Sequence, residues 1–423
     1  MTNSWSEKLA THYGLRLPED LRAWLDDEIW RLAGGAEFSQ PQSPDQLIDP
    51  DGSIWGGFML PDTLPIVGND YGDWLCLRIA ADGHVREVLH WNHGGGDWIP
   101  YGRSLAEALI YDAASRILYD RKPEFTSPEP PTEEVFRLAQ WAVDYATPGR
   151  SGVQPFWRSP PRGEEILSQL LTNHVAEDVA RRDQCLAALT NRLRRDGSPR
   201  LASSLGVPWE PDFVRWQFDS QLLPAAMHAP LTRHFGEPID AIIAQDWNAA
   251  ERAALYVARS RQDLGWALEI AGWAAERRGD LSAAIGLYEL GARAPIFSDD
   301  AVRFRSQWFP PGFGKFAAFR LAELCQHLPP ALQRDDYLQL FLADDADTLR
   351  QRVRDYWYAQ AERAQRQGDA ETAYHALYQA GWDCGLPTLD EYGPLLERLA
   401  DAAKQLGSQP LARLAHAHRQ SLL

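Results

Sequence analysis

The sequence predicts an α+β domain over residues 1–120, an antiparallel sheet flanked by helices, followed by an all-α region over residues 135–423. Short segments rich in β-branched and aromatic residues gather between residues 64 and 102, which is typical of strands. Beyond residue 134 the apolar residues recur about every 3.6 positions, which is typical of amphipathic helices. A chain of 423 residues is also too long for one ordinary hydrophobic core, so two or three domains are expected.

The first predicted helix covers residues 17–32. Pro18 suits a first helical turn, and Glu19 and Asp20 favour the positive end of the helix dipole. One apolar face is formed by Leu21, Trp24, Leu25, Ile29 and Leu32. A loop rich in glycine, proline and aspartate is expected over residues 34–57.

Strands are predicted at residues 64–69, 74–79, 85–91 and 98–102. Asp82 and Gly83 lie between the second and third segments and form a short-range hairpin signal. Ser104 and Glu107 have the spacing of a capping box, so a helix is expected from residue 105 to about residue 119.

The proline- and charge-rich segment of residues 121–134 is the predicted domain boundary. Beyond it, two helix pairs at about residues 266–295 and 356–387 share small residues on their inner faces, and a weaker pair covers residues 396–422. The turns of the first two pairs are alike: Gly279-Asp280 and Gly368-Asp369. These pairs resemble tetratricopeptide-type repeats, which implies a stacked helical array. An irregular all-α domain is the alternative.

The charge of the chain argues for some partners and against others. The formal net charge is −17, and residues 1–120 carry 19 Asp and Glu against 8 Lys and Arg. Phosphates repel such a surface, which disfavours nucleic acid as a direct partner, whereas a basic protein would be attracted. The acidic field therefore belongs mostly to the predicted α+β domain.

The spacing of the cysteines and the lack of a signal-peptide pattern predict a reducing compartment. The four cysteines are far apart and form no C-x-x-C motif, which argues against zinc modules and a disulfide framework. The first residues show no basic-then-apolar signal peptide, and no run of 18 apolar residues occurs. A cytoplasmic protein without a membrane span is expected.

The stretch LHWNHGGGDWIP, residues 89–100, suggests three kinds of site. A lipase-like oxyanion loop would need a G-x-S-x-G nucleophile elbow, and the sequence contains none. His90, His93 and Asp97 could ligate a metal, but they lack a spacing that fixes ligand geometry, and no calcium-loop motif occurs. A glycine-rich turn is the favoured interpretation.

Other chemical motifs are also missing from the sequence. No phosphate-binding loop occurs, and no Ser/His/Asp or Cys/His set can be distinguished from chance. We therefore expect no catalytic residue, no metal and no cofactor, and predict that the protein is not an enzyme. An unrecognised hydrolase is the least favoured alternative.

Three N-terminal segments resemble the SUKH superfamily, the Smi/Knr type of domain: LPEDLRAWL (17–25), LPIVGNDYGDWLCLRI (64–79) and IPYGRSLAEAL (99–109). The matching residues of the central strand pair are Gly68, Asp70, Gly72, Asp73, Leu75 and Leu77. Those of the closing helix are Ser104, Leu105, Glu107 and Leu109. Trp24-Leu25 replaces the usual Phe-Leu, and Arg78 stands where an acidic residue is common, which puts a shared surface at that strand end in doubt. The resemblance covers residues 15–118.

The resemblance implies an α+β fold with a binding role. Bacterial members are widely immunity proteins of polymorphic toxin systems, which bind and mask a secreted toxin, often a nuclease or deaminase. Fungal relatives act as hubs in cell-wall signalling. An acidic surface would speed association with a basic toxin, which agrees with the charge of residues 1–120.

The predicted function is therefore that of a cytoplasmic immunity protein that neutralises a basic cognate toxin by protein–protein interaction. A scaffold or regulatory hub that binds partners through its helical array is the second hypothesis. The predicted partner-binding residues lie at two turns of the sheet: Asp70, Tyr71, Asp73, Trp91, His93, Asp97 and Trp98. Exposed aromatic residues would be anchors, and the aspartates would pair with Arg or Lys of the partner. Alternatively, Asp70 and Asp73 only fix their turn, and the two tryptophans belong to the core.

Overall fold

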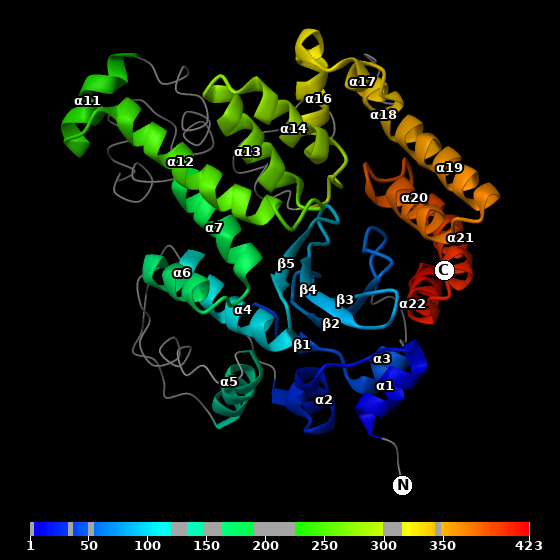
Figure 1. The fold of residues 1–423 in the computed structure, drawn as a ribbon. Helices are drawn as coiled ribbons and strands as arrows, with labels where there is room; N and C mark the ends of the chain where they lie inside the picture. The colour runs from blue at the N-terminus through cyan, green and yellow to red at the C-terminus, as the bar shows by residue number, and fades with distance from the viewer. Residues whose placement is uncertain are drawn as a thin grey trace. The chain divides into compact units, whose positions relative to one another are not determined.

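The structure, a computed structural model, describes residues 4–32, 37–49, 55–119, 133–146, 163–189, 225–298, 315–342 and 348–422 (Figure 1). The chain forms two compact units. Unit 1 consists of residues 1–180 and 350–423, and unit 2 consists of residues 181–349. The predicted boundary at residues 121–134 lies outside the described residues except for its last two positions.

Unit 1 contains one five-stranded antiparallel sheet, in which the strands follow one another in sequence order. The strands are β1 (Gln40–Pro41), β2 (Thr63–Gly68), β3 (Trp74–Ile79), β4 (Val85–Trp91) and β5 (Trp98–Gly102). The four predicted strands are confirmed within one residue at each end, because their turn residues are strong local signals. Gly83 in the β3–β4 turn has φ 86°, and a Cβ atom there would lie 2.5 Å from the Gly14 carbonyl oxygen. Only glycine fits this turn.

In the described residues the N-terminal segment also forms six helices, of which the fourth lies against the sheet at β5. They are α1 (Trp5–Tyr13), α2 (Glu19–Asp26), α3 (Pro44–Ile48), α4 (Leu105–Tyr119), α5 (Glu133–Ala146) and α6 (Gly163–Thr172). Helix α4 has its predicted bounds, and Ser104 Oγ accepts from the Glu107 amide as expected of an N-cap. The Asp20 carboxylate of α2 accepts from the Leu105 amide at 3.0 Å. This contact ties α2 to the start of α4.

The first predicted helix is shorter than expected. Helix α2 ends at Asp26 because Glu28 has φ 53°, and residues Ile29–Leu32 form a separate 3-10 turn, η1. Helices α1 and α3 were not predicted, although Ser4 and Ser43 each begin a capping box. Both helices are short, and α3 lies in a segment whose composition is typical of a loop.

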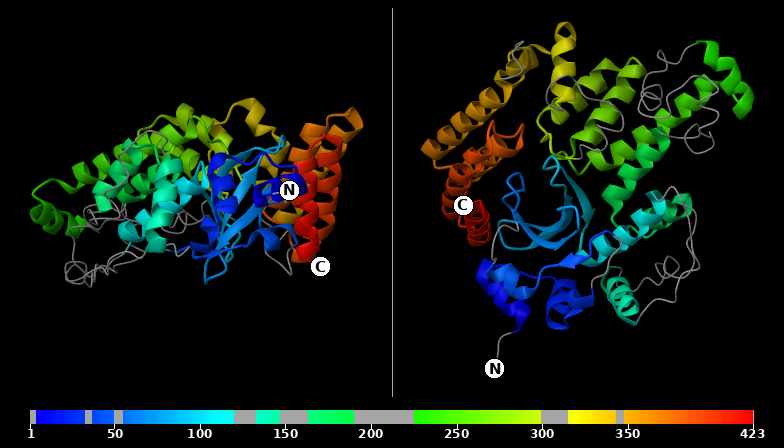
Figure 2. Two further views of the ribbon diagram at one scale, coloured as in Figure 1. Left: turned by 90° about the horizontal axis from the view of Figure 1, so that it is seen from below. Right: turned by 180° about the vertical axis from the view of Figure 1, so that it is seen from behind.

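The C-terminal helices cover one face of the sheet, as both views of unit 1 show (Figure 2). These helices are α20 (Ala370–Trp382), α21 (Tyr392–Gln405) and α22 (Gln409–Ser421), with the 3-10 turn η6 (Leu389–Glu391); α19 (Leu349–Gln367) precedes them in the chain. Trp382 Nε1 donates to the Phe58 carbonyl at 3.0 Å, and Ser408 Oγ donates to the Ala81 carbonyl at 2.7 Å. All six residues of β2 are buried, as in a sheet covered on both faces. The unit therefore joins the two ends of the chain, a grouping that differs from the predicted division at residue 120.

The secondary-structure elements named among the described residues of unit 2 are all helices. It contains α11 (Ala225–Phe235), α12 (Ile239–Ala258), α13 (Gly265–Arg277), α14 (Leu281–Ala292), α16 (Phe316–Glu323), α17 (Pro330–Gln333) and α18 (Asp336–Gln339), with the 3-10 turns η4 (Cys325–His327) and η5 (Leu340–Leu342). Helix α7 (Glu177–Leu189) crosses the boundary between the units. An α+β N-terminal part and a helical C-terminal region are thus confirmed.

Three helix pairs use the same turn chemistry: α13–α14, α19–α20 and α21–α22. A glycine with φ between 73° and 81° ends each turn at Gly279, Gly368 and Gly407. The next residue caps the second helix through its side chain: Asp280, Asp369 and Ser408. The helix pairs therefore lie where the sequence predicted them, and their likeness to tetratricopeptide repeats stays a prediction. No helix in the described residues has the length and apolar character needed to cross a bilayer.

Candidate binding surface at one end of the sheet

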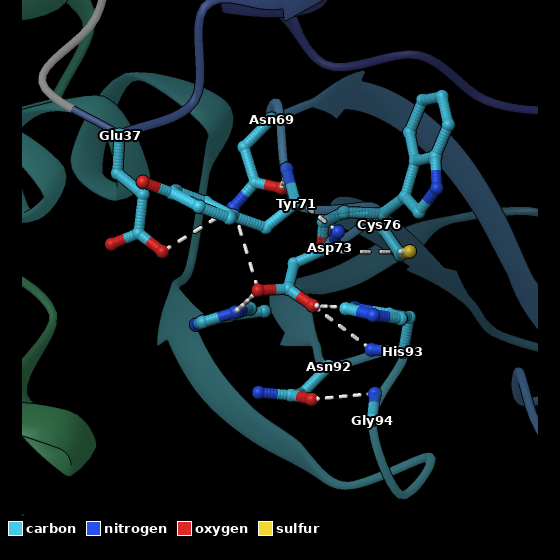
Figure 3. Close-up of polar contacts among 10 residues, drawn as sticks. Glu37, Asn69, Tyr71, Asp73, Cys76, Asn92, His93 and Gly94 are labelled. Carbon is cyan, nitrogen blue, oxygen red and sulfur yellow. Dashed lines mark hydrogen bonds and ion pairs between the residues drawn. The ribbon is translucent and has the colours of Figure 1, made fainter.

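Two connections of the sheet meet at one of its ends. The β2–β3 turn (residues 69–73) and the β4–β5 turn (residues 92–97) are neighbours because Trp74 pairs with Trp91 in the sheet. Glu37 reaches the same place, since the following β1 pairs with the end of β2 (Figure 3). We call these two turns and Glu37 the turn end of the sheet.

Asn69 holds the β2–β3 turn in one conformation. Its Oδ1 accepts from the amides of Tyr71 and Asp73, each at 2.9 Å, and Gly72 takes φ 90°. The Tyr71 side chain projects from this turn and is 75% exposed. Asp70 is also exposed, and its carboxylate accepts from Gln40 Nε2 of β1. The turn thus presents an aromatic and an acidic side chain on a fixed backbone.

Asp73 joins the two turns from a buried position. Its Oδ1 accepts from both the amide (2.9 Å) and Nδ1 (2.8 Å) of His93, as the dashed lines in Figure 3 show. Burial raises the pKa of the Asp73 carboxyl, but the hydrogen bonds from His93 and the nearby imidazole of His90 outweigh burial and hold this pKa well below its ordinary value. Asp73 is therefore a carboxylate at neutral pH and links the two turns through its hydrogen bonds with His93.

The β4–β5 connection is the glycine-rich turn that the sequence favoured. Asn92 Oδ1 accepts from the Gly94 amide at 2.8 Å, and the Asn92 amide donates to the Asp97 carbonyl at 2.7 Å. Gly96 has φ 77°, which a residue with a Cβ atom rarely adopts. Turn geometry thus accounts for Asn92 and the glycines of this connection.

The predicted partner-binding residues divide into exposed and buried sets. Asp70, Tyr71 and His93 are exposed, and Asp97 is half-buried. Trp91 and Trp98 are only 4% and 2% exposed, so the expectation of exposed tryptophan anchors is wrong. They pair across β4 and β5 on the inner side of the sheet, where Gly56 lies against the Trp91 ring and the Arg78 guanidinium lies over Trp98.

Asp73 is a second correction. It was expected to pair with a basic residue of a partner, but it is only 7% exposed and its oxygens accept from groups of this chain. The alternative, that an aspartate of this turn only fixes the backbone, describes Asp73 better. The surface available to a partner is thus formed by Asp70, Tyr71, His93 and, in part, Asp97.

No family model, curated protein or solved structure matches this chain. The SUKH resemblance therefore stays an inference from the three quoted segments.

Two residues of the turn end, Glu37 and Asn69, were not predicted from the sequence. Ligand atoms of Glu37, Asp73 and His90 all lie within 4.8 Å of one another. His90 was weighed as a metal ligand with His93 and Asp97, but not with Glu37. Glu37 is 36 residues from Asp73 in the sequence, and no local pattern marks it as a neighbour.

A second polar cluster lies within the sheet, on the side of the C-terminal helices. Arg78 pairs with Asp62 (3.0 Å) and Glu87 (3.1 Å), and all three are under 10% exposed. Tyr378 of α20 donates to Asp62 at 3.3 Å. Arg78, which departs from the SUKH pattern, thus lies in a buried ion-pair cluster beneath α20 and not on the surface.

Proposed function

We propose that the protein is a non-enzymatic binding protein that uses the turn end of the sheet to contact a basic partner protein. Its role would be that of an immunity protein, which masks a toxin domain. The observation that carries this proposal is Tyr71, a 75% exposed aromatic residue on a turn held by side-chain hydrogen bonds. A tyrosine on a rigid backbone loses little conformational entropy on binding, which suits an interface anchor.

Charge supports a basic partner. Residues 1–120 carry 19 acidic and 8 basic residues, and Asp70 stands exposed beside Tyr71 in the same turn. Opposite charge on a partner would raise the association rate, and added salt would lower it. A toxin nuclease fits this description because it must be basic where it meets phosphate. The SUKH resemblance supports the same class of partner.

A toxin domain encoded by a neighbouring gene is the partner that the immunity role requires, and the first test measures binding to such a domain with Tyr71→Ala as the variant. We expect a loss of affinity of about 30-fold or more, since a central aromatic anchor contributes about 2 kcal/mol or more. Tyr256→Ala is the matched control because Tyr256 is another partly exposed tyrosine (41%) in unit 2. Biolayer interferometry gives both rate constants.

Co-expression completes the test. The wild-type chain should rescue cells from the toxin, and Tyr71→Ala should rescue them less well. Equal affinity of the Tyr71→Ala and wild-type chains would exclude the turn end as the interface. Failure of the wild-type chain to rescue or to co-purify with the toxin would exclude the immunity role.

The scaffold hypothesis is supported by a different observation. The three helix pairs share one turn design, and Gly272 of α13 lies so close to α14 that a Cβ atom would be 2.5 Å from the Tyr288 ring. Such close helix packing is a feature of repeat proteins that bind other proteins. A partner captured by the chain whose binding is unchanged by Tyr71→Ala but lost on deletion of α13 and α14 would favour this hypothesis.

A further inference from the structure

Three side chains from separate segments converge at the turn end with the donor atoms of a metal site. Glu37 precedes β1, Asp73 ends the β2–β3 turn and His90 lies in β4. One oxygen or nitrogen of each lies within 4.8 Å of the others. Figure 3 shows the carboxylates of Glu37 and Asp73 on either side of the Asn69 amide.

His90 presents a nitrogen that this chain does not satisfy. Its Nε2 is buried, has no hydrogen-bond partner among the described residues, and lies 3.8 Å from Asp73 Oδ2, beyond hydrogen-bond distance. Phe38 and Tyr101 pack edge-on against the imidazole with centroid distances of 4.9 and 5.4 Å, which fixes the ring. A buried imidazole nitrogen without a partner is costly in free energy unless something else binds it.

His93 and Asn69 hydrogen-bond to the two carboxylates, as outer-sphere residues do around a metal site. His93 donates twice to Asp73 Oδ1, which leaves Asp73 Oδ2 facing His90. Asn69 Nδ2 donates to Glu37 Oε1 at 3.3 Å and to Asp73 Oδ2 at 3.4 Å. Hydrogen-bonded carboxylate ligands are a common feature of protein metal sites.

We propose that Glu37, Asp73 and His90 bind one divalent transition-metal ion of the zinc type. An imidazole with two carboxylates suits Zn²⁺ better than Ca²⁺ or Mg²⁺, which prefer oxygen ligands alone. Zinc bonds of about 2.0–2.2 Å place ligands about 3.3 Å apart, so the groups must move inward by about 1 Å. Glu37 is exposed, so its side chain can make most of this movement.

The ion would add positive charge to an otherwise acidic surface and fix Glu37 against the two turns. This inference goes beyond the proposed partner binding and does not rest on it, because the free chain alone provides all three ligands. Metal binding and toxin binding are measured separately, so the failure of one leaves the other standing.

The test is isothermal titration calorimetry of the full-length chain with Zn²⁺, Mg²⁺ and Ca²⁺. The titration is repeated in a Cys325→Ser background because thiolates are zinc ligands and the Cys325 thiol is exposed. We expect one Zn²⁺ per chain in both backgrounds, no comparable heat with Mg²⁺ or Ca²⁺, and a melting temperature that rises with Zn²⁺ concentration. The visible absorption of bound Co²⁺ reports directly on the ligand set.

Four variants identify the site. Glu37→Ala and His90→Gln should each lower the Zn²⁺ affinity at least about tenfold and alter the Co²⁺ spectrum. His93→Ala should weaken binding by about 10- to 100-fold while keeping the stoichiometry, as expected of a positioning residue. His84→Ala is the control, since His84 has an aspartate partner, Asp82, in a turn at the other end of the strands.

Two outcomes would overturn the proposal: no saturable Zn²⁺ binding by the wild-type chain, or unchanged affinity in Glu37→Ala. Glu37→Ala keeps the test valid if His90→Gln fails to fold, because the Glu37 side chain is exposed. Circular dichroism and thermal melting confirm the folding of each variant.

Discussion

His418 shows how one buried residue makes stability depend on pH. It is fully buried in α22, its Nε2 donates to the Gly56 carbonyl at 3.0 Å, and its Nδ1 has no partner among the described residues. Desolvation lowers the pKa of His418 to about 4, although the hydrogen bond to Gly56 opposes this shift. The folded protein therefore keeps this imidazole neutral where the unfolded chain protonates it.

The sign of the effect follows from proton binding. Between pH 6.5 and about 4 the unfolded state binds more protons at this position than the folded state, so stability falls as the pH falls. The loss of folding stability caused by His418 amounts to about 3 kcal/mol by pH 4. Asp73 affects stability at lower pH than His418. Folding depresses the pKa of its carboxyl, so the stability that Asp73 contributes is lost only as the pH falls below the ordinary carboxyl pKa of about 3.9.

We expect His418→Gln to reduce the loss of stability between pH 6.5 and 4.5 relative to the wild-type chain. Glutamine keeps an N–H donor for the Gly56 carbonyl but does not titrate. Urea unfolding at several pH values measures the slope, and His375→Gln, at an exposed histidine of α20, is the control. An identical slope in His418→Gln and the wild-type chain would show that His418 is not buried in this way.

Whether a site residue could be predicted depended on whether its setting is determined locally in the sequence. Clusters of Asn, Asp and Gly at residues 68–73 and 92–97 mark turns locally, so both turns of the turn end were predicted. The burial of Trp91 and Trp98 was only the alternative expectation, because it depends on which face of the sheet the segment around Gly56 covers. Glu37 was missed for a related reason, since its approach to Asp73 depends on the pairing of β1 with β2.

At the scale of elements, alanine substitutions at two glycines of the α13–α14 pair are expected to change stability in opposite directions. A Cβ atom at Gly272 would lie 2.5 Å from the buried Tyr288 ring, whereas no described atom lies within 4 Å of one at Gly286. Both residues are helical, so alanine removes backbone entropy from the unfolded chain at either position. Only Gly272→Ala must also displace a ring in a packed core.

We expect Gly286→Ala to stabilise the protein by up to about 1 kcal/mol. Gly272→Ala should destabilise it, because overpacking costs about 1–3 kcal/mol and exceeds the helical gain over most of this range. Chemical denaturation of both variants measures the difference. Equal and favourable effects would mean that α13 and α14 are not in close contact at Gly272.

Secondary-structure elements were the most predictable part of the fold. The strands and α4 follow from alternation, Asp82-Gly83 and the Ser104 cap, all of which act within a few residues. The break at Glu28 was not predicted, because nothing in the helical pattern of residues 17–32 marks a positive φ there. Helix α1 had a visible signal, the Ser4–Glu7 capping box and Gly14, that was not used.

At the scale of the whole molecule, the pairing of the two ends of the chain is the feature that the sequence could not predict. Tyr378 and Asp62 are 316 positions apart, and His418 and Gly56 are 362 apart. Periodicity reports the apolar face of a helix but not which surface covers it. The sheet thus looked like the core of a self-contained domain of residues 1–120, although its second face is covered by α20–α22.

Because of this packing, we expect residues 1–180 expressed alone to lack a cooperative unfolding transition. The fragment would expose apolar strands and leave the buried Arg78–Asp62–Glu87 cluster open to water on the side of Tyr378. It should bind the dye ANS, which reports exposed apolar surface. Co-expression with residues 350–423 should restore cooperative melting, since Arg413 and Ser408 re-form their bonds to α1 and to the β3–β4 turn. Cooperative melting of residues 1–180 alone, near the melting temperature of the full chain, would contradict this expectation. It would mean that the N-terminal segment is an independent domain whose folding does not require the C-terminal helices.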